Sequence, residues 1–129
     1  TLFGQVPIMT INGEQYAQSM ALLRYAGRLT GLYPIDPIQA LKVDMIVDQL
    51  GDILQNMVPV FREQDPEKKK SLADDIVKNK LPGPCSALDK ILCKQSPQFA
   101  CGSSLTIADL CIYNMGSLFK SGMSLQYML

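Results

Sequence analysis

Residues 4–34, GQVPIMTINGEQYAQSMALLRYAGRLTGLYP, decide how this chain folds. A short apolar run over 8–11 leads into Asn12-Gly13, two residues that tolerate the positive φ angles of a tight hairpin turn. From Ser19 onward apolar residues recur at helical spacing, until Gly31 offers the left-handed conformation that commonly ends a helix. The sequence therefore predicts a β-hairpin followed by an amphipathic helix.

Two polar residues, Gln18 and Ser19, stand where this helix begins. Ser19 is a natural N-cap, and the free amides of a first helical turn favour a carboxylate or phosphate. The helix dipole contributes only about 0.3–1 kcal/mol at an exposed site, so specific binding also needs the two side chains. A cis peptide bond between Val6 and Pro7 would leave the Val6 backbone groups free for a ligand. Together these features predict a receptor for a small anion.

The rest of the chain has a helical pattern. Asp36 as N-cap and Pro37 as the first helical residue start a long helix that Pro59 kinks or ends. Its predicted buried stripe is Ile38, Leu41, Met45, Ile46, Leu50, Ile53, Leu54, Met57 and Val58. Two further helices are predicted over 65–80 and 84–94, separated by Pro82-Gly83-Pro84.

Three carboxylates, Asp44, Asp48 and Asp52, follow each other every four residues along the long helix. For Asp44 and Asp48 we prefer the interpretation of a solvated acidic face. Like charges at this spacing cost a few tenths of a kcal/mol per pair, so a cation or a partner surface nearby is mildly favoured.

Composition excludes several classes of partner. The 129 residues contain 12 Lys and Arg, 12 Asp and Glu, and no His, so the net charge is zero. This balance lacks the electrostatic footprint of a protein that binds nucleic acid or an anionic membrane. No apolar stretch approaches the roughly 20 residues that span a bilayer, and the first residues lack the pattern of a signal peptide. We expect a cytoplasmic protein with neither nucleic acid nor membrane as partner.

The four cysteines, Cys85, Cys93, Cys101 and Cys111, form no CxxC pair. Without histidine this spacing predicts no metal site, and we expect four reduced thiols that pack as small hydrophobes. No nucleophile with a neighbouring base and no glycine-rich phosphate loop is present.

Thr106 and Asp109 have the spacing of a capping pair. The threonine hydroxyl can accept from the third helical amide while the aspartate carboxylate reaches back to the threonine amide. Asp109 is therefore predicted to be structural and not catalytic.

Several of these motifs, taken in order, resemble a known family. Gln5-Val6-Pro7, Asn12-Gly13, Gln18-Ser19, Arg24-Tyr25 and Gly31-Leu32-Tyr33-Pro34 resemble the second half of the glutathione-binding domain of cytosolic glutathione transferases of the sigma, pi, mu and alpha grouping, with sigma-like members most similar. Residues 105–110, LTIADL, resemble the helix-start signature in the core of that family's C-terminal domain. The resemblance extends from Phe3 to about Lys120 and is lost in the tail.

The resemblance implies a mainly α fold with a small α/β part. Residues 1–33 would be the C-terminal half of a thioredoxin-like glutathione-binding domain, and residues 34–129 an all-helical bundle domain, also truncated. We therefore expect a partial sequence that lacks the first strand-helix-strand segment and the C-terminal helices. The tail from Ser121 is either a fragment end or an altered reading.

The resemblance also assigns binding roles. Gln18 and Ser19 would hold the γ-glutamyl end of glutathione, with its α-carboxylate on the helix N-terminus. Val6, before a cis Pro7, would pair through its backbone with the cysteinyl part, and Gln5 would lie toward the glycine end.

A sixth binding residue implies a dimer. Asp52 aligns with the family's acidic residue that reaches across a homodimer to the γ-glutamyl amine of the partner's ligand.

The family's activity depends on a residue that the resemblance places before Thr1. A thiol with a pKa near 8.5 is mostly protonated at neutral pH, and the family's Tyr or Ser stabilises the thiolate. The chain alone is thus expected to hold no catalytic residue and to be inactive. The implied function is conjugation of glutathione, a co-substrate and not a cofactor, to hydrophobic electrophiles in detoxification. The alternatives are a glutathione-dependent isomerase and a non-catalytic, crystallin-like binding protein.

Overall fold

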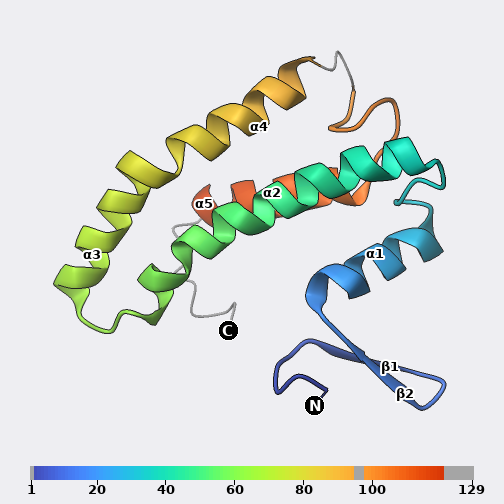
Figure 1. The fold of residues 1–129 in the computed structure, drawn as a ribbon, viewed down its shortest axis with the longest axis horizontal. Coiled ribbons are helices and arrows are strands. Elements are labelled where there is room, and N and C mark those ends of the chain that lie inside the picture. Colours follow the sequence, from blue (N-terminus) through green and yellow to red (C-terminus); the bar gives the residue numbers. More distant parts are fainter. Residues whose placement is uncertain (1, 95–97, 121–129) are drawn as a thin grey trace.

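The computed structural model describes residues 2–94 and 98–120, and the tail in which the family resemblance is lost lies outside them. In chain order the elements are β1 (Ile8–Ile11), β2 (Glu14–Ala17), α1 (Ser19–Thr30), α2 (Pro37–Arg62), α3 (Pro66–Asp75), the π-helical turn η1 (Ile76–Lys80), α4 (Pro82–Lys94) and α5 (Ile107–Lys120). The long α2 lies beside α5, the arc of α3, η1 and α4 lies on one side of this pair, and α1 with the hairpin lies on the other (Figure 1). The fold is thus mainly helical with a single small sheet in the described part of the chain, as predicted.

The hairpin forms as its turn residues predict. β1 and β2 pair in antiparallel register, with Ile8 opposite Ala17 and Ile11 opposite Glu14. Asn12 has φ 51° and Gly13 has φ 84°, the left-handed values that a tight two-residue turn requires. The predicted cis peptide bond between Val6 and Pro7 is present.

The start of α1 differs from the prediction. Ser19 is the first helical residue and not the N-cap, and Gln18 occupies the N-cap position with φ 76° and no capping bond from its side chain. The positive φ of Gln18 turns the chain from β2 into the helix one residue early, which places Ser19 inside the first turn. At the other end Gly31, with φ 73°, donates its amide to the Gly27 carbonyl and ends the helix as predicted.

Helix α2 starts as predicted and continues further. The Asp36 side chain accepts from the Gln39 amide at 2.8 Å, and Pro37 is the first helical residue. Pro59 does not end the helix, which continues to Arg62. The Pro59 carbonyl still accepts a hydrogen bond, from the Glu63 amide at 3.2 Å.

The arc of helices differs from its prediction at one junction. Asp65 caps α3 by accepting from the amides of Glu67 and Lys68, as expected for a helix that starts at this point. Helix α4, however, begins at Pro82, so the Pro-Gly-Pro sequence forms its first turn instead of separating two helices. Prolines are tolerated there because first-turn amides have no helical partner.

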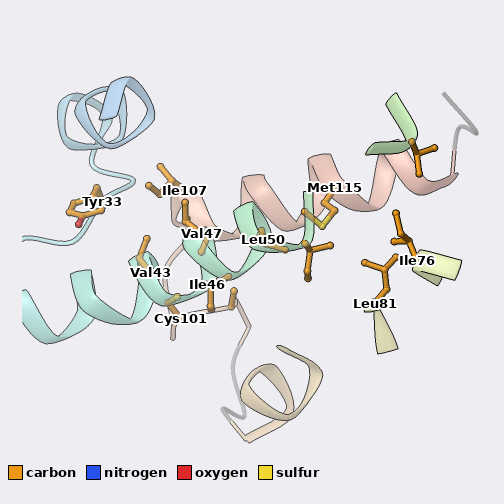
Figure 2. Close-up of a cluster of buried hydrophobic side chains, with 14 residues drawn as sticks. Tyr33, Val43, Ile46, Val47, Leu50, Ile76, Leu81, Cys101, Ile107 and Met115 are labelled. Carbon is orange, nitrogen blue, oxygen red and sulfur yellow. The ribbon is translucent and has the colours of Figure 1, made fainter. Parts of the chain in front are cut away.

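The hydrophobic core lies between α2, α5 and the arc (Figure 2). Its buried residues are Tyr33, Val43, Ile46, Val47, Leu50, Ile53, Val60, Ile76, Leu81, Ala100, Cys101, Ile107, Ala108 and Met115. The predicted stripe of α2 is right for 46, 50 and 53 but wrong at its first three positions. Ile38, Leu41 and Met45 are 60%, 55% and 53% exposed. Helix α2 is apolar on two faces, and α5 and the arc cover the face that carries Val43 and Val47 instead.

Candidate functional site

A small hollow of about 80 Å³ lies between the segment before β1 and the start of α1. Its lining residues are Phe3, Gln5, Val6, Pro7, Ala17, Gln18 and Ser19. Five of the six residues proposed to hold glutathione therefore lie together. The pairing of Ile8 with Ala17 explains this, because antiparallel register brings the residues just before β1 next to those just after β2.

The floor of this hollow is the beginning of α1. The first intrahelical hydrogen bond runs from the Leu22 amide to the Gln18 carbonyl at 3.0 Å, so the amides of residues 19–21 precede the helical ladder. Both Gln18 and Ser19 are exposed. A positive φ at a residue other than glycine is uncommon and concentrates at functional sites. This end of α1 therefore offers backbone donors, one hydroxyl and one amide side chain to an anion.

Asp52 is not among the residues that line the hollow. It lies on the middle of α2, exposed, and its backbone carbonyl accepts from Asn56 Nδ2 at 3.0 Å. Within the described residues, no hydrogen bond or ion pair engages its carboxylate, which is therefore open to a partner. Its role across a dimer remains a prediction.

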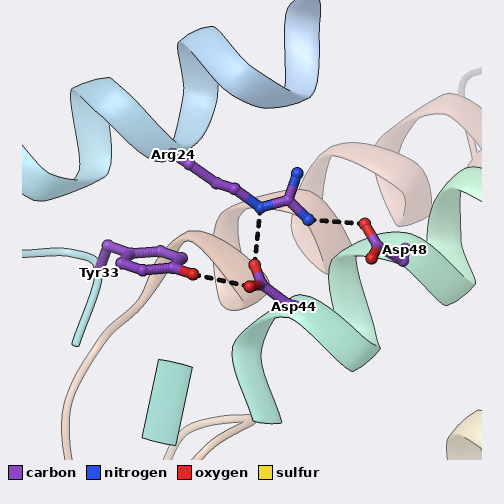
Figure 3. Close-up of polar contacts among 4 residues, drawn as sticks. All are labelled: Arg24, Tyr33, Asp44 and Asp48. Carbon is purple, nitrogen blue, oxygen red and sulfur yellow. Dashed lines mark hydrogen bonds and ion pairs between the residues drawn. The ribbon is translucent and has the colours of Figure 1, made fainter. Parts of the chain in front are cut away.

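A polar network connects α1 to α2, and the sequence did not reveal it (Figure 3). Arg24 Nε donates to Asp44 Oδ1 and Arg24 Nη2 donates to Asp48 Oδ1, both at 2.7 Å. Tyr33 Oη donates to Asp44 Oδ2 at 2.7 Å, and the Arg28 guanidinium lies 5.0 Å from the Tyr33 ring centre. The prediction of a solvated acidic face is right for Asp48, whose side chain is 66% exposed, and wrong for the half-buried Asp44. Arg24 from α1 is the cation that these like charges were expected to favour.

Residues 51–127 match the family model described as "Glutathione S-transferase, C-terminal domain". The chain belongs to the glutathione S-transferase family. It is 38% identical over 120 residues to glutathione S-transferase 2 of Manduca sexta, covering 93% of this chain and 59% of that protein. It is 34% identical over 107 residues to the hematopoietic prostaglandin D synthase of Gallus gallus, covering 83% of this chain and 52% of the synthase.

A solved structure agrees with this assignment. The glutathione S-transferase of Ascaris lumbricoides superposes with a TM-score of 0.76 at 32% identity, covering all of this chain and 65% of that one. The sigma-like resemblance is thus confirmed, and the hairpin with α1 is a remnant of the family's N-terminal domain beside its C-terminal helices. The chain spans less than two thirds of the length of these relatives. The division of the chain into two domains between residues 33 and 34 stays a prediction.

The predicted capping pair is present with one difference. Asp109 Oδ2 accepts from the Thr106 amide at 2.8 Å, the bond that the spacing predicts. The Thr106 hydroxyl does not accept from a helical amide but donates to the same oxygen at 3.0 Å. Asp109 Oδ1 also accepts from the Ala100 amide at 2.7 Å. One carboxylate thus holds both the start of α5 and the loop before it.

Two of the four cysteines pack inside the protein as expected, and the other two are exposed. Cys101 is buried and Cys111 half-buried, and burial raises the pKa of each thiol, so both stay protonated at neutral pH. Cys85 and Cys93 are exposed on α4. Within residues 2–94 and 98–120, no group of three His, Cys, Asp or Glu side chains could hold a metal ion, and no helix is long and apolar enough to cross a membrane.

The Arg24 network predicts a pH dependence of stability for this chain. Partial burial alone would raise the pKa of Asp44, but hydrogen bonds from Arg24 and Tyr33 and the charge of Arg24 together hold it below its usual value. A depressed carboxyl pKa stabilises the fold above about pH 4, and this contribution is lost as the pH falls through the lowered value. We expect Asp44→Asn to cost about 1 kcal/mol at pH 7 and nothing at the acid end.

Urea unfolding of both proteins between pH 7 and pH 2.5 measures this difference. Asp74→Asn, at an exposed position on α3, is the matched control and should leave the pH profile unchanged. Parallel profiles for the Asp44 variant and the parent chain would contradict the stabilising role of Asp44.

Proposed function

We propose that this chain binds reduced glutathione in the 80 Å³ hollow at the start of α1. The γ-glutamyl carboxylate lies against the free amides of the first turn, assisted by Gln18 and Ser19, because a helix N-terminus favours negative charge. Val6 pairs through its backbone with the cysteinyl part, and Gln5 lies toward the glycine end. The convergence of five predicted residues on one hollow carries this proposal.

The proposed activity of the whole protein is conjugation of glutathione to an electrophilic, apolar small molecule. The acceleration of this conjugation would come from holding the two substrates close together and from stabilising the thiolate of glutathione. We place the thiol-activating group outside this chain.

A second candidate uses the same bound glutathione for an isomerisation. The similarity to a prostaglandin D synthase favours it, because that relative is named for making a product other than a conjugate. Glutathione binding is common to both candidates, so only the second substrate separates them.

We further propose that the protein acts as a homodimer. Five exposed apolar side chains lie along the end of α1, the link and the start of α2: Leu29, Ile35, Ile38, Leu41 and Met45. An apolar surface of this kind often marks an interface. Asp52 lies on the same helix and would reach the partner's ligand from it. Sedimentation equilibrium measures the assembly, and a monomer at micromolar concentration would contradict a stable dimer.

Retention on glutathione-agarose followed by a conjugation assay with chlorodinitrobenzene tests the function in the intact protein. Retention with turnover supports the transferase, and formation of prostaglandin D from its isomeric precursor instead supports the isomerase. Retention without either reaction supports the non-catalytic alternative. Failure to bind glutathione refutes the site.

Ser19→Ala is the variant that tests this site most directly. It removes one hydroxyl bond to a charged group, worth about 1.5 kcal/mol or more, and should weaken glutathione binding about tenfold. Calorimetric titration measures the affinity. Ser71→Ala, at an exposed position on α3, removes a hydroxyl away from the hollow and should change nothing. Unchanged affinity in a folded Ser19 variant would refute the proposed contact.

A further inference from the structure

Helix α3 is the part of the arc with the least buried surface. It lies where the chain turns from α2 into the arc, on the far side of the molecule from the hairpin (Figure 1). Val60 and Ile76, which are 6% and 1% exposed, anchor the chain before and after it, and no residue of the fully described segment between them is buried. Leu72 and Ala73 pack against the core, and both are only half-buried. The helix can therefore open locally with a small loss of buried apolar surface while its two anchors stay in place.

The exposed side of α3 carries three consecutive lysines followed by a serine. Lys68, Lys69, Lys70 and Ser71 are all exposed. The sequence holds no other serine or threonine that directly follows two or more basic residues. Within the described residues, none of the three lysines forms an ion pair and no hydrogen bond engages the Ser71 hydroxyl. The three cations and the hydroxyl are therefore available to a partner.

Three cations directly before an accessible serine fit the substrate of a serine kinase that selects basic residues. Such a kinase binds its substrate as an extended segment in an acidic cleft, so the charges next to the hydroxyl determine specificity. A closed helix does not fit this cleft, but the local opening of α3 supplies the extended form. Leu72, which follows the serine, leaves its contact with the core in the same opening.

We propose that Ser71 is a phosphorylation site for a serine kinase of this class. Ser71 Oγ attacks the γ-phosphorus of ATP and the bond from that phosphorus to the β-phosphate oxygen breaks. ADP leaves, and the hydroxyl proton passes to the kinase and then to solvent. The site lies on α3 and shares no residue with the lining of the proposed glutathione hollow, so it does not rest on the proposed function.

The phosphate loosens α3. A phosphoserine carries a charge of about −1.5 to −2 at pH 7. The helix neighbours of Ser71, three and four residues away, comprise one cation and three carboxylates: Lys68, Glu67, Asp74 and Asp75. Repulsion therefore exceeds attraction, and the small buried surface of the helix does little to oppose it. Phosphorylation thus shifts the opening equilibrium of α3 toward the open form.

Incubation of the intact protein with ATP and the catalytic subunit of cyclic-AMP-dependent protein kinase, which selects basic residues before serine, tests the site. We expect tandem mass spectrometry to find phosphate on Ser71 and on no other residue of this chain, and Ser71→Ala to abolish the incorporation. The double variant Lys68→Gln/Lys69→Gln should lower the initial rate about tenfold, because the kinase loses two charge contacts. The matched double variant Lys78→Gln/Lys80→Gln, at exposed positions on η1, should leave the rate unchanged.

Hydrogen exchange measured by mass spectrometry tests the effect of the phosphate on the helix. The amides of residues 66–75 should exchange about tenfold faster in the phosphorylated protein, while those of α2 and α5 stay unchanged. Unchanged or slower exchange in α3 would contradict the loosening.

Three results would overturn the site itself. They are equal phosphate uptake by the Ser71→Ala chain, an undiminished rate in the Lys68→Gln/Lys69→Gln variant, and phosphate on a synthetic peptide of residues 64–76 but not on the protein. The last result would mean that α3 does not open to a kinase. None of these outcomes depends on whether the chain binds glutathione.

Discussion

Asp109→Ala is expected to lower the free energy of unfolding by about 3 kcal/mol while glutathione affinity in the folded protein stays within about twofold. The carboxylate accepts three hydrogen bonds, from the Ala100 amide, the Thr106 amide and the Thr106 hydroxyl. Its removal leaves partly buried donors unpaired, at about 1–3 kcal/mol, and removes a helix cap worth about 1 kcal/mol. Asp109 lies outside the residues that line the proposed glutathione hollow.

Urea unfolding followed by circular dichroism measures the first effect, and calorimetry of the folded fraction measures the second. Asp74→Ala, an exposed aspartate of α3, controls for the loss of one negative charge and should change stability by less than 0.5 kcal/mol, the usual bound for surface substitutions. Equal folding with lost glutathione binding would overturn the structural assignment of Asp109.

The sequence predicts one of the hydrogen bonds that Asp109 accepts from a backbone amide but not the other. The bond to Thr106 follows from a spacing of three residues, which fixes the geometry of a first helical turn. The bond to Ala100 joins residues nine apart through a loop of irregular conformation, so no local pattern indicates it. Local rules predicted the cap, and only the folded loop shows what else the carboxylate holds.

The glutathione hollow was predictable because its parts are close in sequence. Turn chemistry at Asn12-Gly13 sets the hairpin register, and that register brings the Val6-Pro7 segment next to Gln18. The error at Ser19 has a physical cause. Nothing in the sequence indicates that a glutamine adopts a positive φ, so the helix was expected to begin one residue later than it does.

Tertiary pairing between helices was not predictable. Arg24 is 20 residues from Asp44 and 24 residues from Asp48, so no local sequence pattern pairs them. Considered alone, the four-residue spacing of the two aspartates indicates a solvated helix face. Helix α2 presents apolar side chains on two faces, so its pattern cannot tell which face the rest of the protein covers. The structure buries Val43 and leaves Met45 exposed because α5 and the arc pack on one face only.

The crossing of α1 and α5 depends on a glycine. A Cβ added at Gly27 would lie 2.7 Å from Ile107 Cγ2 and 3.2 Å from Tyr33 Cβ, and all three residues are buried. A shift of α1 away from α5 is opposed by the bond between the Ile107 amide and the Leu32 carbonyl, and the Gly27 carbonyl itself accepts from the Leu32 amide at 2.8 Å. The contact therefore has little freedom to relax.

Gly27→Val should consequently lower the free energy of unfolding by about 3 kcal/mol, the upper range for overpacking a well-packed interior. Gly51→Val is the matched control, because a Cβ at Gly51 in α2 meets no atom within 4 Å. Valine has a slightly higher helix propensity than glycine, so this control should be neutral or stabilising by a few tenths of a kcal/mol. Urea unfolding of both variants measures the difference. Equal effects at the two positions would mean that α1 does not lie against Ile107, and the placement of the hairpin and its hollow beside the helical core would then be wrong.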